Sequence, residues 1–149
     1  MIRPVSIFIL VFPLLSACQP QQDIKIRAVG EGFYWHFTYA GQDGILDTQD
    51  DIHQPKILYL PKGRSSKIQV TSKDYVYMFR SAKLGINELA TPGLAFTVEF
   101  TATKRGDFSL EIDPLCGANF LHDHEYMGML SVISTGEFNQ WLENRDTHI

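Results

Sequence analysis

Short runs of alternating apolar and polar residues cover most of the chain between residues 24 and 133. Strict alternation at residues 24–29 is typical of a strand with one buried face, and the aromatic run at 33–39 also favours a strand. Glycine and proline residues separate the runs and indicate turns. We expect eight strands, at residues 24–29, 33–39, 56–60, 67–71, 75–80, 95–101, 107–112 and 129–133.

A helical period is found only near the C-terminus. Ser134 and Glu137 have the spacing of a capping box, which marks the start of a helix. Phe138, Trp141 and Leu142 then fall on one helical face. Eight short strands and one helix in a chain of 149 residues predict an all-β fold, a β-sandwich with a short C-terminal helix packed against it.

The N-terminal segment has a different pattern. Residues 1–17 contain a single basic residue and an apolar run at 5–15, which is too short to span a bilayer and is typical of a secretory signal. The sequence LSAC at residues 15–18 resembles a bacterial lipobox, which implies cleavage before Cys18 and lipidation of this cysteine. The alternative is an ordinary secreted protein in which Cys18 is incidental. Gln19 after the cysteine favours sorting to the outer membrane.

These patterns divide the chain into a lipoprotein signal peptide at residues 1–17, a lipidated N-terminus and linker at 18–23, and one domain at 24–149. We expect the domain on the periplasmic face of a bacterial membrane, because multiple acyl chains bind a membrane stably where one does not. The net charge of −4 and the lack of a basic run argue against a nucleic-acid partner. The sequence contains no nucleophile–base pair and no phosphate-binding loop, so we expect no small-molecule substrate.

The candidate chemistry is concentrated at residues 116–129, CGANFLHDHEYMGM. This window contains Cys116, two of the five histidines and two of the four methionines. Thiolate, imidazole and thioether are ligands that copper prefers. With Cys18 lipidated, Cys116 has no partner for an internal disulfide, so either burial or metal ligation must protect its thiol. The window therefore predicts a copper site.

Several stretches together carry a family resemblance. In chain order, they are GFYWHFTYAGQDG, LYLPKG, VTSKDYVYMF, LGINELATPG, TKRGDF, LCGAN, HEYM and EFNQWL. Through them, residues 25–142 resemble the soluble cupredoxin domain of cytochrome c oxidase subunit II, which holds the dinuclear copper centre called CuA. The resemblance implies a Greek-key cupredoxin sandwich with the metal at one end and a c-type cytochrome as a redox partner.

The ligand positions depart from the family pattern. The resemblance implies a histidine where this chain has Tyr77, and a pair of bridging cysteines where it has Ile112 and Cys116. His124 and Met127 match the remaining histidine and methionine, displaced by a four-residue insertion. A dinuclear centre needs two bridging thiolates, so we predict a single copper ion instead.

The source of the fourth ligand stays open. Cys116, His124 and Met127 supply three ligands of the types found in mononuclear cupredoxins. Either His122 or the phenolate of Tyr77 would complete the set, an arrangement similar in kind to the red copper proteins of the nitrosocyanin type. A free tyrosine titrates near pH ~10, so a Tyr77 that lies beside the metal is an equal alternative to direct ligation.

Four functions are compatible with this ligand set. The first is a membrane-tethered electron carrier that cycles one copper near a respiratory complex and is not an enzyme by itself. The second is a copper chaperone or assembly protein that binds Cu(I). The third is a small redox enzyme with an open copper position. The fourth is a metal-free scaffold in which Cys116 and Met127 are buried and Tyr77 and Ile112 fill the ligand places.

Other polar and aromatic residues are expected to be structural. The acidic segment at residues 43–53 lacks the alternation of a calcium-binding loop, which predicts a solvated hairpin insertion. Trp35 is expected in the core, and His36 is expected on the exposed face of a strand.

Overall fold

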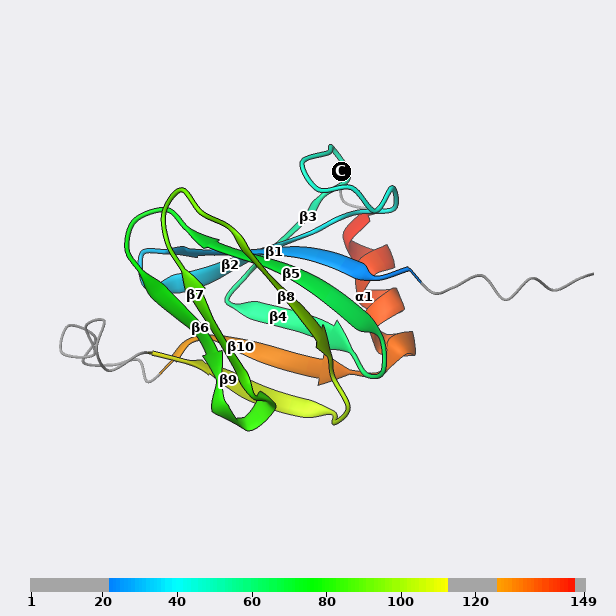
Figure 1. Ribbon diagram of the computed structural model, residues 1–149. Helices are drawn as coiled ribbons and strands as arrows, with labels where there is room; N and C mark the ends of the chain where they lie inside the picture. The colour runs from blue at the N-terminus through cyan, green and yellow to red at the C-terminus, as the bar shows by residue number, and fades with distance from the viewer. Residues whose placement is uncertain (1–21, 113–125, 147–149) are drawn as a thin grey trace, which may run out of the picture.

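The protein forms two packed layers of β-strands with one helix along the side, as the computed structural model shows for residues 22–112 and 126–146 (Figure 1). One layer is a five-stranded sheet in the order β3-β2-β1-β5-β8. The other contains β4-β10-β9, and the β6–β7 hairpin lies next to β9. The strands are β1 (Ile24–Glu31), β2 (Tyr34–Tyr39), β3 (Ile52–Pro55), β4 (Ile57–Pro61), β5 (Ser65–Ser72), β6 (Tyr77–Ser81), β7 (Ile86–Ala90), β8 (Phe96–Thr101), β9 (Gly106–Glu111) and β10 (Tyr126–Ile133). The helices are η1 (Ala82–Leu84) and α1 (Thr135–Asp146).

The alternation in the sequence produces the core between the layers. β1 pairs in parallel with β5 and antiparallel with β2, and β10 pairs in parallel with β4 and antiparallel with β9. Every second side chain is buried along most of β1, β2 and β5, and burial of apolar surface is the main force that holds the layers together. The inward-facing residues include Ile26, Ala28, Leu58, Leu60, Ile68, Val70, Leu130 and Val132.

Helix α1 begins at the predicted capping box. The backbone N–H of Glu137 donates to the Ser134 hydroxyl over 3.2 Å, and the backbone N–H of Ser134 donates to the Glu137 carboxylate over 2.7 Å. Phe138 is fully buried, and the Trp141 ring lies 4.9 Å from the ring of Tyr39. The predicted sandwich with a C-terminal helix is confirmed.

Each of the eight predicted strands has a counterpart, with ends that differ by a few residues, but two further strands were not predicted. β3 is a four-residue edge strand that ends in proline. In β7, apolar residues do not mark the buried positions, because Leu89 is exposed while Glu88 is half-buried. Between β2 and β3, the acidic segment is a loop held by its own hydrogen bonds and by an exposed ion pair between Asp47 and Arg27. This agrees with the solvated insertion that we expected.

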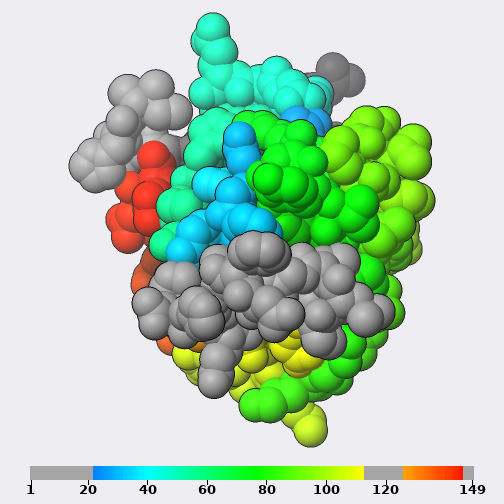
Figure 2. Space-filling model, turned by 90° about the vertical axis from the view of Figure 1, so that its left-hand side faces the viewer, coloured from blue at the N-terminus to red at the C-terminus, as the bar shows by residue number. Residues whose placement is uncertain are grey.

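The two ends of the sandwich contain different segments of the chain. β1 runs from the end where the chain enters at Gln22 to the end where its turn into β2 lies beside the segment that precedes β6 (Figures 1 and 2). Glu111 at the end of β9 pairs with Tyr126 at the start of β10 at this second end. Among the described residues, no helix is both long and apolar enough to cross a membrane.

Gly30 on β1 provides the first prediction. A Cβ at this position would lie 2.4 Å from the Tyr77 ring, so Gly30→Ala should lower the free energy of unfolding by about 1–3 kcal/mol through overpacking. Urea unfolding followed by circular dichroism measures the change. The control is Gly136→Ala in α1, where a Cβ meets nothing within 4 Å and stability should not fall. Equal effects of the two substitutions would contradict the close packing of Tyr77 on β1.

Candidate functional site

A two-residue turn forms the tip of the sandwich at the end where β9 finishes and β10 begins. Gly32 and Phe33 both have positive φ, 58° and 65°, between the paired residues Glu31 and Tyr34. This is the conformation of a tight hairpin turn, and it is uncommon for a residue such as phenylalanine. The Gly32 N–H donates to a carboxylate oxygen of Asp74 over 2.7 Å, and the Phe33 N–H donates to the Tyr77 hydroxyl over 3.3 Å. Two side chains therefore hold the turn: Asp74, just before β6, and Tyr77, the first residue of β6.

Tyr77 is the centre of this arrangement. Its side chain is 3% exposed, and its ring packs on Gly30. Its hydroxyl donates to Oδ1 of Asp74 over 2.7 Å. Burial disfavours the phenolate, and the neighbouring carboxylate disfavours it further, so the pKa of Tyr77 is raised to about 12. Tyr77 is a neutral hydrogen-bond donor at physiological pH.

Asp74 connects the turn to β6 through three hydrogen bonds. It accepts from the N–H of Gly32, the hydroxyl of Tyr77 and, over 2.8 Å, the N–H of Tyr75. Partial burial by itself would raise the pKa of Asp74, but these donors outweigh it and leave the pKa below its ordinary value. A fixed negative charge is thus held beside the Tyr77 hydroxyl.

Aromatic rings extend from the surface to the core at this end. Phe33 stacks on the exposed ring of Tyr75 at 5.5 Å, and Tyr77 lies 6.1 Å from Trp35. Trp35 is fully buried, as expected, and His36 on the same strand is exposed. A Cβ on Gly128 would lie 3.5 Å from Trp35 and 2.8 Å from a backbone oxygen of Lys56, so only a glycine lets β10 approach this closely.

The predicted metal residues fall into two groups. Tyr77 and Met127 are described, and both belong to the buried cluster that includes Trp35. Met127 is 2% exposed and lines a pocket of 270 Å³ with Tyr34, Lys56 and Tyr126. Cys116, His122 and His124 lie outside the described residues, as does the predicted lipidation site Cys18. Within residues 22–112 and 126–146, no three histidine, cysteine, aspartate or glutamate side chains form a group that could hold a metal.

The described residues do not fit a two-copper centre of the CuA type. At the position of the family histidine, the Tyr77 hydroxyl is already engaged by Asp74 and Phe33. At the position of the first bridging cysteine, Ile112 is an aliphatic side chain packed against the core. Neither side chain offers the soft or borderline donor that such a centre needs.

Sequence reasoning missed Asp74, although it proposed Tyr77. The partners of Asp74 and Tyr77 in the β1–β2 turn lie 42 and 44 residues away in the sequence, so no local pattern shows them. The spacing of Asp74 and Tyr77, three residues apart, is the signal that was available.

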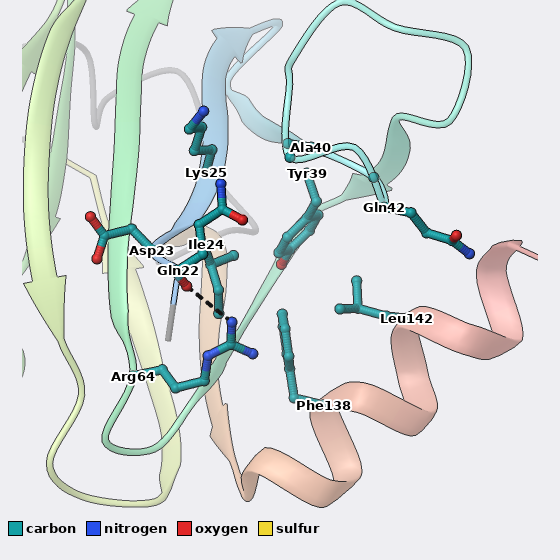
Figure 3. A pocket seen from close by; sticks show the side chains of 12 residues that line it. Gln22, Asp23, Ile24, Lys25, Tyr39, Ala40, Gln42, Arg64, Phe138 and Leu142 are labelled. Carbon is teal, nitrogen blue, oxygen red and sulfur yellow. Dashed lines mark hydrogen bonds between the residues drawn. The ribbon is translucent and has the colours of Figure 1, made fainter. Parts of the chain in front are cut away.

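A second pocket lies at the opposite end of β1, between the start of this strand and α1 (Figure 3). It has a volume of 190 Å³, and Phe138 and Leu142 of α1 form its apolar wall. Arg64 reaches into it from the β4–β5 turn and donates to the backbone oxygen of Gln22 over 3.2 Å. The chain therefore enters the domain far from Tyr77 and Met127.

Comparison with known proteins adds the family context, although no family model matches the chain. A probable cytochrome c oxidase subunit 2 of Rickettsia prowazekii is 28% identical over 137 residues, which cover 83% of this chain and 42% of the relative. The chain spans about half the length, or less, of the rickettsial relatives that it matches.

Solved structures agree with the curated relatives. The periplasmic domain of subunit II of cytochrome oxidase (CoxB) of Bradyrhizobium japonicum is 26% identical with a TM-score of 0.66, and the match covers 86% of this chain and 96% of that one. A CoxB domain in a mixed disulfide intermediate with the thioredoxin-like protein TlpA is 25% identical with a TM-score of 0.67, over 86% and 95% of the two chains.

The two layers of strands, with aromatic rings at one end, define a cupredoxin-like β-sandwich domain. The relatives specify the type further, as the sequence resemblance implied. They support a cupredoxin domain like that of cytochrome c oxidase subunit II. Tyr77 and Ile112 stand where the sequence resemblance implies two of the metal ligands.

The raised pKa of Tyr77 provides a prediction about alkaline stability. An unfolded tyrosine ionises near pH ~10, whereas the folded Tyr77 ionises only at about 12. Its contribution to stability is therefore complete below pH ~10 and is lost as the pH rises toward 12. Tyr77→Phe should have a shallower loss of unfolding free energy over this range, measured by urea unfolding at a series of pH values. Parallel curves for the parent and Tyr77→Phe would contradict the assignment.

Proposed function

We propose that the chain is a periplasmic copper-binding cupredoxin that carries one copper ion and transfers single electrons in or near a respiratory chain. The observation that carries this proposal is the combination of a subunit II-type domain with Tyr77 and Ile112 in place of two copper ligands. The relatives favour a copper and electron-transfer role. The two replacements favour one metal ion over two.

Met127 lies at the start of β10, and the other proposed ligands fall in the sequence between β9 and β10. Cys116 supplies the thiolate, Met127 supplies a weak thioether, and His124 and His122 supply imidazoles, which together suit a mononuclear copper site. Tyr77 would not be a ligand, because its hydroxyl already has a carboxylate acceptor and a backbone donor. Bound copper would supply one-electron redox chemistry. The role of the described residues is to hold Tyr77, Trp35 and the start of β10 in fixed packing.

The lipid anchor on Cys18 would hold the domain at the membrane, in keeping with the periplasmic location of the CoxB domain. Gln22, four residues after Cys18, enters at the end of β1 away from Tyr77. Eight residues of strand at about 3.3 Å each separate the two ends by about 26 Å. The anchored domain would therefore present its metal end to periplasmic redox proteins, such as a c-type cytochrome, and not to the lipid.

Copper delivery or assembly is the second candidate function. It is favoured by the solved complex in which a subunit II domain forms a mixed disulfide with a thioredoxin-like protein. Copper binding needs a reduced thiol, because the thiolate is the metal ligand. A thioredoxin-like protein that keeps Cys116 reduced is thus a candidate partner. An intense thiolate-to-Cu(II) absorption band with reversible electrochemistry would favour electron transfer, whereas colourless binding of Cu(I) alone would favour delivery.

The two cysteines of the chain allow a matched test of these roles. Cys116→Ser should abolish copper retention while the protein stays in the membrane fraction, because only the metal thiolate is removed. Cys18→Ser should do the reverse and keep about one copper per chain while it leaves the membrane fraction. Metal analysis of purified protein and fractionation of expressing cells measure the two properties. A Cys116→Ser protein that retains copper as the parent does would rule out the proposed site, and a Cys18→Ser protein that stays in the membrane would rule out the anchor.

A further inference from the structure

The two buried tyrosines of the described chain differ in what accepts their hydroxyl proton. Tyr39 is fully buried and donates to the backbone oxygen of Tyr59 over 3.0 Å. Tyr77 is 3% exposed and donates to the Asp74 carboxylate over 2.7 Å. A peptide oxygen is too weak a base to accept the proton of a phenol that loses an electron, whereas a carboxylate is a strong enough base. Only Tyr77 is therefore placed to lose its proton without leaving its position.

We propose that Tyr77 is a redox-active tyrosine whose proton is accepted by Asp74. One electron passes from the phenol to a one-electron oxidant of the oxygen-radical class, which is thereby reduced. In the same step, the O–H bond of Tyr77 breaks and an O–H bond forms on Oδ1 of Asp74. The products are a neutral tyrosyl radical and a neutral carboxylic acid, and one electron from a thiolate-class reductant, with the proton returned by Asp74, restores the pair.

The surroundings of Tyr77 suit this step. Charge separation is avoided inside the buried site, because the proton moves only along an existing short hydrogen bond to a positioned base. Asp74 is itself exposed, so its proton can exchange with water. The ring stays fixed by Gly30 and by the Phe33 N–H bond to its oxygen, so oxidation requires little rearrangement.

Neighbouring rings give the electron a route between the surface and the interior. Tyr75 is 59% exposed, and its ring centroid lies 6.4 Å from that of Tyr77. On the other side, the buried Trp35 lies 6.1 Å from Tyr77 and contacts the start of β10 at Gly128. Thiols and thioethers are easily oxidised, and Met127 belongs to the same buried cluster as Trp35. Tyr75, Tyr77 and Trp35 would carry oxidising equivalents from there to the surface, a function that does not require bound copper.

The test uses the full metal-free chain and a photogenerated ruthenium(III) tris-bipyridine oxidant. Transient absorption follows radical formation, and electron paramagnetic resonance of rapidly frozen samples identifies the radical. The parent should form a long-lived tyrosyl radical, and Tyr77→Phe should lose it. Asp74→Asn should form it about 100-fold more slowly, the low end of what a positioned base contributes. Tyr39→Phe is the matched control and should leave the radical unchanged.

Two outcomes would overturn the proposal. One is a long-lived radical of the same yield in Tyr77→Phe, which would place it on another tyrosine. The other is equal rates in the parent and in a folded Asp74→Asn, which would exclude Asp74 as the proton acceptor. If Asp74→Asn does not fold, the rate of radical formation by the parent is instead compared between heavy water and ordinary water. A slower rate in heavy water supports proton transfer within the step, and an unchanged rate contradicts it.

Discussion

The Asp74 carboxylate holds together the end of the sandwich where the β1–β2 turn meets the start of β6. It binds the β1–β2 turn through Gly32 and the start of β6 through Tyr77, two segments that are far apart in the sequence. A charged acceptor with three donors forms stronger hydrogen bonds than a neutral one, so this contact fixes the turn despite the unfavourable φ of Phe33. The Tyr77 ring can then pack on Gly30 and against Trp35.

This packing decides what chemistry the end of the sandwich can support. A histidine at position 77 would offer a free ring nitrogen to a metal, whereas Tyr77 offers a hydroxyl that is neutral and already hydrogen-bonded. Ile112 replaces a second soft donor with an aliphatic side chain that joins the core. The fold matches that of subunit II domains, while Tyr77 and Ile112, at positions where the resemblance implies ligands, are part of the core packing. The remaining candidate ligands amount to one thiolate, two imidazoles and one thioether, a set that suits one copper ion.

The sequence predicted those features of the fold that depend on local pattern. Strict alternation located β1, and the spacing of Ser134 and Glu137 located the start of α1. β3 and β7 were not predicted because β3 is very short and β7 has an apolar residue, Leu89, on its exposed face.

The candidate site was predictable only in part. Its residue types indicated candidate ligands, and the resemblance implied that Tyr77 and Ile112 stand at ligand positions. Cys116, His122 and His124 lie outside the described residues, so their ligand roles stay predictions. The role of Asp74 was not predictable, because its partner Gly32 is brought to it only by the packing of β1 beside the segment before β6.

The central claim is that this domain holds a single copper ion, and electron paramagnetic resonance of the copper-loaded protein tests it most directly. A copper nucleus with spin 3/2 splits the signal of its unpaired electron into four lines. An electron shared equally between two such nuclei gives seven lines. We predict the four-line pattern of one Cu(II), and a seven-line pattern would contradict the account.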